Sequence, residues 1–211
     1  GMYGENSGVK NAGTVAMSLA GVGIYGKDSI IENTGTIITG DTIKTGLTEE
    51  TAVGIYATGT SDVRNISNIN TGWSSVGIFG ENGTIINDGT ITAGESSIYM
   101  FTYGAGGNII NNSLLDLTDR SIGIYATAGT AVKDNKNYGE AAGTTDKNGN
   151  PTVNNVYSMN KTVTMAAGDT NYTNKDNPTM VETEFEDNAG WTEKANEKYV
   201  LQKFQFLDLL C

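Results

Sequence analysis

The chain has 211 residues, with 28 Gly, 28 Thr and 23 Asn but only two Pro, a mixture that favours many short strands and turns over a helix bundle. It contains no His, and its single cysteine is Cys211, which excludes Ser-His-Asp triads, Cys-His dyads, His-ligated zinc, internal disulfides and cysteine metal sites. The formal net charge of −11 repels phosphate backbones, so we expect no nucleic-acid partner.

The first residues, Gly1-Met2-Tyr3, carry neither a basic region nor an apolar region of the kind that begins a signal peptide. Every apolar run in the chain is far shorter than the roughly 20 residues that a membrane-spanning helix needs. We therefore expect no signal peptide in these residues and no direct membrane insertion of this segment.

Two short patterns alternate along the chain from residue 9 onward. The first places an apolar residue, Asn, Gly or Ser, and a second apolar residue at every other position, and it occurs at 9–15, 31–37, 63–69, 85–91 and 109–115. The second reads GIYG or a close variant and occurs at 20–26, 52–57, 75–80, 97–102 and 121–126. Both alternate with the period of two that is typical of strands.

One copy of this repeat is longer than the others. The Asn of the first pattern precedes the middle Gly of the second by 12 residues at 11→23, 65→77 and 111→123, but by 21 residues at 33→54. The extra residues fall within 39–51, which we interpret as a loop insertion in which Thr42→Asp would be tolerated.

Strands that recur every 22 to 24 residues with turns between them predict an all-β parallel β-helix, or β-solenoid. Equivalent residues of successive coils would stack about 4.8 Å apart and form apolar ladders in the core. One ladder comprises Val9, Ile31, Val63, Ile85 and Ile109, and the other Ile24, Ile55, Ile78, Met100 and Ile124.

Two further rows follow from the same repeat. An asparagine row shares the parity of the core residues and is interpreted as a structural ladder of side-chain hydrogen bonds: Asn11, Asn33, Asn65, Asn87 and Asn111. An aromatic row has the opposite parity and is expected on the outside of the coil: Tyr25, Tyr56, Phe79, Phe101 and Tyr125. An exposed row could bind sugars or a protein, and a covered or purely stacking row would serve structure alone.

Other motifs carry no comparable signal for function. Residues 21–26, GVGIYG, match the dinucleotide fingerprint, but the residues that follow continue the strand repeat and do not begin a helix. Paired carboxylates can serve glycosidase or lyase chemistry, and the candidates near turns are Asp62, Asp88, Asp116 and Asp119. Nothing in their spacing singles them out, so each is interpreted as a solvated surface charge, and we expect no catalytic residue, metal or cofactor.

The composition changes after residue 128. We predict regular coils over 1–128, a polar excursion with degenerate coils over 129–190, and a C-terminal cap, helix or edge strand, over 191–211. Within the middle part, 153–159 fits the first pattern loosely, and the cap ends in the apolar run 204–210.

The repeats GIYGKDSIIENTGTI at 24–38 and GIFGENGTIINDGTI at 77–91 resemble the passenger regions of bacterial autotransporter proteins. This resemblance implies a right-handed parallel β-helix that is displayed on, or released from, the surface of a two-membrane bacterium, often as an adhesin. It also implies host-cell proteins or glycans, and adjoining parts of a larger passenger, as partners. The alternative is a polysaccharide-active lyase or hydrolase, since parallel β-helices host these enzymes too.

Overall fold

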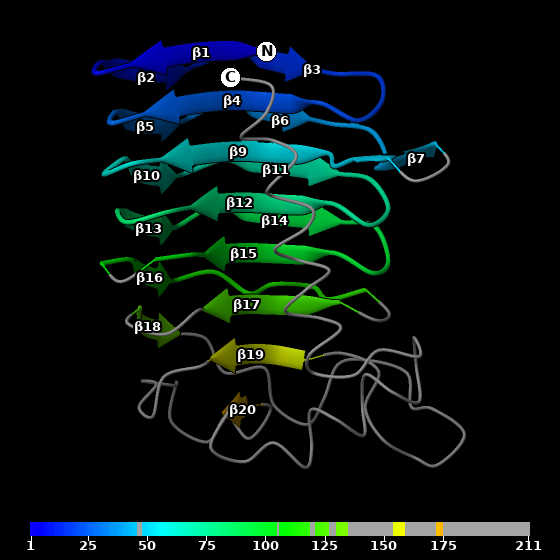
Figure 1. Ribbon diagram of the computed structural model, residues 1–211, viewed down its shortest axis with the longest axis vertical. Coiled ribbons are helices and arrows are strands. Elements are labelled where there is room, and N and C mark those ends of the chain that lie inside the picture. The colour runs from blue at the N-terminus through cyan, green and yellow to red at the C-terminus, as the bar shows by residue number, and fades with distance from the viewer. Residues whose placement is uncertain are drawn as a thin grey trace.

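The chain folds as an all-β parallel β-solenoid of about five turns, as predicted from the repeat. The structure is a computed structural model and describes residues 1–45, 48–104, 106–118, 121–126, 130–134, 154–158 and 172–174. These residues form strands and turns and contain no helix, hence none that could cross a bilayer. Successive coils lie one below another along the long axis of the molecule (Figure 1).

Each regular coil contributes one strand to each of three parallel sheets. Sheet A contains β1 (Met2–Glu5), β4 (Val22–Lys27), β9 (Val53–Thr58), β12 (Val76–Gly80), β15 (Ile98–Thr102), β17 (Ile122–Ala126), β19 (Asn154–Ser158) and β20 (Tyr172–Asn174). Sheet B contains β2 (Gly8–Asn11), β5 (Ile30–Asn33), β10 (Asp62–Asn65), β13 (Thr84–Asn87), β16 (Asn108–Asn111) and β18 (Ala131–Asp134). Sheet C contains β3 (Thr14–Ala16), β6 (Thr36–Ile38), β11 (Asn68–Thr71) and β14 (Thr90–Ala93).

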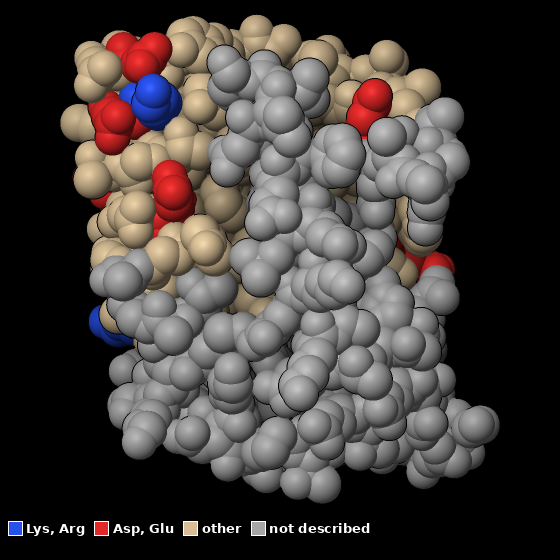
Figure 2. Space-filling view, viewed as in Figure 1, with Lys and Arg blue, Asp and Glu red and all other residues tan. Residues whose placement is uncertain are grey.

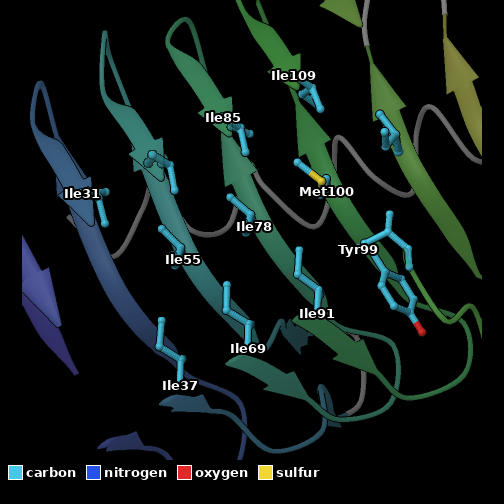
Figure 3. Close-up of a cluster of buried hydrophobic side chains, with 14 of the residues drawn as sticks. Ile31, Ile37, Ile55, Ile69, Ile78, Ile85, Ile91, Tyr99, Met100 and Ile109 are labelled. Atoms are coloured by element: carbon cyan, nitrogen blue, oxygen red, sulfur yellow. The ribbon is translucent and has the colours of Figure 1, made fainter. Parts of the chain in front are cut away.

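The core lies between the three sheets and is built from ladders of equivalent residues. Ile31 is level with Val63 in sheet B, and Ile55 is level with Ile78 in sheet A. A third ladder, from sheet C, includes Ile69 and Ile91 and completes the cluster (Figure 3). Full burial of each such side chain contributes about 1.5–3 kcal/mol, which a single coil could not obtain alone.

Gly23 shows why the GIYG pattern needs its glycine. A Cβ atom built on Gly23 would lie 2.5 Å from Cγ2 of Ile37 and 2.6 Å from the carbonyl oxygen of Gly54, closer than real Cβ contacts. The side chain of Ile37, from sheet C, therefore occupies the space that a larger residue at position 23 would need. The GVGIYG motif lies on β4 and is followed by β5, so it is a strand of the solenoid and not a dinucleotide site.

Tyr99 stands where Gly23, Gly54 and Gly77 stand in other coils, and its side chain is fully buried. Its hydroxyl donates a hydrogen bond to the carbonyl oxygen of Asp116 at 2.6 Å and accepts one from the backbone N–H of Thr118 at 3.2 Å. No strand of sheet C is found in the described residues after β14. The hydroxyl of Tyr99 instead binds the backbone of residues 116–118, which follow β16.

The corner between sheets A and B uses a left-handed residue in three successive coils. Asn6, Asp28 and Gly59 occupy this position with φ angles of 48°, 49° and 63°. Asn, Asp and Gly are the residues that adopt this conformation most readily, so the sequence supplies suitable residues at this corner.

The insertion at 39–51 is a β-hairpin and not an irregular loop. Strands β7 (Ile43–Thr45) and β8 (Thr48–Glu50) pair antiparallel and project from the side of the solenoid (Figure 1). The expected tolerance of Thr42 is wrong, because this side chain is buried at the base of the hairpin. Its hydroxyl donates to the carbonyl oxygen of Ser74 at 2.6 Å and accepts from the N–H of Ala52 at 3.1 Å.

Two strands lie in the region after residue 128, where degenerate coils are predicted. Strand β18 extends sheet B in register, with Val132 level with Ile109. Strand β19 pairs with β17 in sheet A, which places Tyr157 level with Tyr125. Residues 154–158 therefore follow the second pattern and not the first. The expected cap at 191–211 lies outside the described residues.

Candidate binding surfaces

The five asparagines form one continuous row inside the solenoid. Each Nδ2 donates a hydrogen bond to the Oδ1 of the asparagine in the next coil, at 2.8, 2.8, 2.9 and 2.9 Å along the row. The row ends at Asn111, whose Nδ2 donates to the carbonyl oxygen of Ser113 at 2.7 Å. All five side chains are buried, so this row joins coil to coil and offers no polar strip to a ligand.

Two rows of serine hydroxyls make similar contacts at the corners and were missed in the sequence. In one, the N–H of Ser29 donates to Oγ of Ser61 at 3.0 Å. In the other, the N–H groups of Ser75 and Ser97 donate to Oγ of Ser97 and Ser121 at 3.0 and 3.2 Å. A detectable signal existed, since a serine is the first residue of the second pattern at 75, 97 and 121.

The aromatic row lies on the face of sheet A that points away from the solenoid core, as its parity predicts. These rings form a cluster separate from the central core, together with apolar residues of the same strands. Ring centroids are 5.5 Å apart between Tyr25 and Tyr56, 4.7 Å between Tyr56 and Phe79, and 5.1 Å between Phe101 and both neighbours, Phe79 and Tyr125. Tyr3, which the sequence patterns missed, extends the row by stacking on Tyr25 at 5.4 Å.

Most of the aromatic row is buried, which favours the covered alternative over an exposed binding strip for these rings. Tyr3 is 66% exposed and Tyr25 is half-buried, but Tyr56 and Phe79 are each 3% exposed. Phe101 and Tyr125 are buried equally well. The arrangement corresponds to the covered, stacking alternative and buries both faces of sheet A from β9 to β17.

The acidic side chains at the turns bind neighbouring coils. Four of them accept a hydrogen bond from a backbone N–H: Asp28 from Thr60 at 3.0 Å, Asp41 from Trp73 at 2.7 Å, Asp62 from Thr84 at 2.8 Å and Glu81 from Gly59 at 2.6 Å. In the part of the face that Figure 2 colours, charged side chains gather mainly along the edge where turns join sheets A and B.

Asp88 is held by two polar partners from adjoining coils. Asn112 Nδ2 donates a hydrogen bond to Oδ1 of Asp88 at 2.7 Å. Arg64 donates a hydrogen bond from Nε to Oδ2 of Asp88, and its Nη2 forms an ion pair with the same oxygen, both at 3.0 Å. The hydrogen bond from Asn112, with a smaller contribution from Arg64, lowers the pKa of the Asp88 carboxyl.

The carboxylates considered for catalysis have separate surroundings. Asp62 binds Thr84, Asp88 binds Arg64 and Asn112, the side chain of Asp116 is exposed, and Asp119 lies outside the described residues. Among the residues that the structure describes, no group of three or more His, Cys, Asp or Glu could hold a metal ion.

The described strands of sheet C carry no charged side chain on their outer face. The side chains of this face stand in two in-register rows, Thr14, Thr36, Asn68 and Thr90 in one and Ala16, Ile38, Asn70 and Thr92 in the other. All are exposed except the half-buried Thr36. The outer face of sheet B differs, since it carries charges such as the Lys10–Glu32 pair at 2.9 Å.

Comparison of the chain with protein-family models, curated proteins and solved structures gives no match. The β-solenoid architecture is therefore established by the strand register and the ladders described above.

Proposed function

We propose that this chain is a non-enzymatic segment of a bacterial surface protein of the autotransporter type, in which it serves as a stiff stalk and offers an adhesive surface. One observation carries the proposal: polar and acidic side chains are used to join one coil to the next. The asparagine ladder, the serine rows and the turn carboxylates all bind neighbouring coils. Such contacts resist bending and separation of the stack, as a stalk requires.

The outer face of sheet C is the surface that we propose for adhesion. Its hydroxyl and amide groups are exposed and regularly spaced, and none of its eight side chains is charged. A neutral face allows a molecule of net charge −11 to approach a host glycan or protein with little electrostatic repulsion from the contact surface itself.

Location and adhesion are tested separately. Antibodies against the purified chain should label intact bacteria, and protease added to intact cells should remove the labelling; labelling only after lysis would contradict surface display. Beads coated with the chain should adhere to host cells or glycan arrays through sheet C.

The variant Asn70→Glu, Thr92→Glu places two charges on the outer face of sheet C and should reduce bead adhesion. The matched control is Ile86→Glu, Lys133→Glu on the outer face of sheet B, which should leave adhesion intact. Equal adhesion by both variants would contradict the assignment of sheet C. Release of cleaved products from a polysaccharide would instead favour the lyase or hydrolase alternative.

A further inference from the structure

Asn82 and Gly83 form an Asn-Gly pair at the corner between β12 and β13. The side chain of Asn82 is exposed, and the residues that lie against Asn82 from the next coil include Gly104 and Gly106, which have no side chain to cover its amide. Asn-Gly is the dipeptide in which an asparagine amide is lost most readily, because a glycine has no Cβ to crowd its own backbone nitrogen. The exposed position therefore makes this pair a candidate for chemical modification.

The hydrogen bonds of this corner leave out the two groups that would have to react. On one side of Gly83, the N–H of Asn82 donates to the carbonyl oxygen of Gly59 at 3.0 Å. On the other side, the N–H of Thr84 donates to Oδ1 of Asp62 at 2.8 Å. In the part of the chain that the structure describes, neither the N–H of Gly83 nor the side-chain amide of Asn82 has a hydrogen-bond partner. The two groups can therefore react without first breaking such a bond.

Other asparagines of the solenoid lack this combination. Asn6 is also exposed and is followed by a small residue, but the N–H of Ser7 donates to Oγ of Ser29 at 3.2 Å. Asn65, in the asparagine ladder, is buried and hydrogen-bonded through both its Oδ1 and its Nδ2. Asn82 combines an exposed amide, a following glycine and an N–H that no described residue binds.

We propose that Asn82 is a site of spontaneous deamidation in the folded protein. The backbone nitrogen of Gly83 attacks Cγ of Asn82 and forms a five-membered succinimide, while the side-chain nitrogen leaves as ammonia and takes the proton of the Gly83 N–H with it. Water then opens the ring. Cleavage of the new bond to Cγ gives aspartate, and cleavage of the original peptide bond gives isoaspartate, in which the main chain runs through Cβ and Cγ.

The fold retains the reactive pair and is sensitive to its product. A Cβ atom on Gly83 would collide with the carbonyl oxygen of Ser61, so the corner requires glycine at this position. The product places a new carboxylate next to Glu81, whose own carboxylate accepts from the N–H of Gly59 at 2.6 Å, and like charges repel. Isoaspartate also adds a carbon to the main chain of this corner. Deamidation should therefore weaken the junction between β12 and β13.

Mass spectrometry of peptides from the full chain, incubated folded in neutral buffer, tests the reaction. The peptide that contains residue 82 should gain the mass difference between NH2 and OH, and protein isoaspartyl methyltransferase should label it. Asn6 and Asn65 should keep their amides in the same sample. If Asn82 keeps its amide in the folded chain for as long as the chain in urea needs to lose it, the proposal is overturned.

The variant Asn82→Gln tests the assignment to this residue, because a glutamine would have to close a six-membered ring, which forms far more slowly. Its peptide should keep its mass, and the fold should be unchanged because the side chain is exposed. The matched control is Asn6→Gln, at the equivalent corner of the first coil, in which Asn82 should still deamidate. A mass gain in the Asn82→Gln peptide, or its absence at Asn82 in the control, would contradict the proposal.

Thermal melts test the effect on the corner. Fresh parent and fresh Asn82→Gln protein should unfold at the same temperature, whereas after equal incubation the parent should unfold at a lower temperature than the variant. Changes elsewhere in the chain are shared by both samples and cancel in this comparison. Equal midpoints after incubation, with residue 82 deamidated in the parent, would overturn the expected weakening of the corner.

Discussion

Asn65 lies in the middle of the asparagine ladder and is bonded to the coil on either side. Its Oδ1 accepts from Asn33 at 2.8 Å, and its Nδ2 donates to Asn87 at 2.9 Å. Burial removes water as an alternative partner, so each amide depends on its neighbour in the row.

We expect Asn65→Ala to lower the free energy of unfolding by about 2–3 kcal/mol, because it leaves the buried amides of Asn33 and Asn87 each without one partner. Asn70→Ala is the matched control, since Asn70 is exposed on the outer face of sheet C and should change stability by less than about 0.5 kcal/mol. Urea unfolding measures both. Equal effects would mean that the ladder contributes nothing beyond side-chain volume.

Asp88 makes the stability of the solenoid sensitive to acid. Because its pKa is lower in the folded state than in the unfolded state, its contribution is complete above the unfolded pKa, about 4. The contribution is lost as the pH falls through the lowered folded value.

The variant Asp88→Asn should therefore be less stable than the parent at pH 7, and this difference should shrink as the pH falls below about 4. Urea midpoints at several pH values measure the effect. A difference that stays constant from pH 7 to the acid limit would show that the ionised carboxylate is not the group responsible. Asp116→Asn provides a control at an exposed carboxylate.

At the scale of elements, the hairpin of β7 and β8 is an addition to a coil that closes without it. Thr42 and Ala52 are joined by a hydrogen bond at 3.1 Å, so the chain leaves and re-enters the coil at adjacent points. In the preceding coil, Val22 is level with Val53. The residues just before Val22, Ala20 and Gly21, are adjacent in the sequence, so that coil turns into sheet A without an insertion.

Deletion of residues 43–51 should thus leave the solenoid folded, with a thermal midpoint close to that of the parent, because the loop-closure cost of a short insertion is small. Thr42→Asp, in contrast, should lower the midpoint clearly, since it removes a buried hydroxyl that is both donor and acceptor. Circular dichroism melts test both variants. A deletion that unfolds the chain would show that the hairpin is part of the core.

At the scale of the whole molecule, stability is a sum of similar coils and the interfaces between them. The first coil, β1 to β3, contacts the rest of the solenoid through one side only, because its strands lie at the end of each sheet. Its removal would expose an equivalent surface of the next coil.

We expect a chain that begins at Val22 to keep its β-sheet spectrum and to unfold with a smaller urea dependence. Since the solenoid has about five turns, the m value should fall by roughly a fifth. A complete loss of structure would instead indicate that the first coil nucleates folding of the others.

The repeat allowed much of the solenoid to be predicted. Val9, Ile31 and Asn33 take their inward positions from a strand period of two, and their register follows from the spacing of the copies. The turn serines and Tyr3 obey the same repeat and could have been found with it. Tyr157 could not be placed reliably, because residues 153–159 fit one pattern in sequence and pair with another in sheet A.

The sequence by itself determined what is local and repeated: the strand period, the length of a coil, the apolar ladders and the parity of the aromatic row. Only the tertiary structure decided that Tyr56 and Phe79 are buried and that Thr42 is enclosed at the base of a hairpin. It also decided that the hydroxyl of Tyr99 binds the carbonyl oxygen of Asp116. The physical reason is that periodicity specifies the direction of a side chain, whereas burial depends on a second surface supplied by residues far away in the chain.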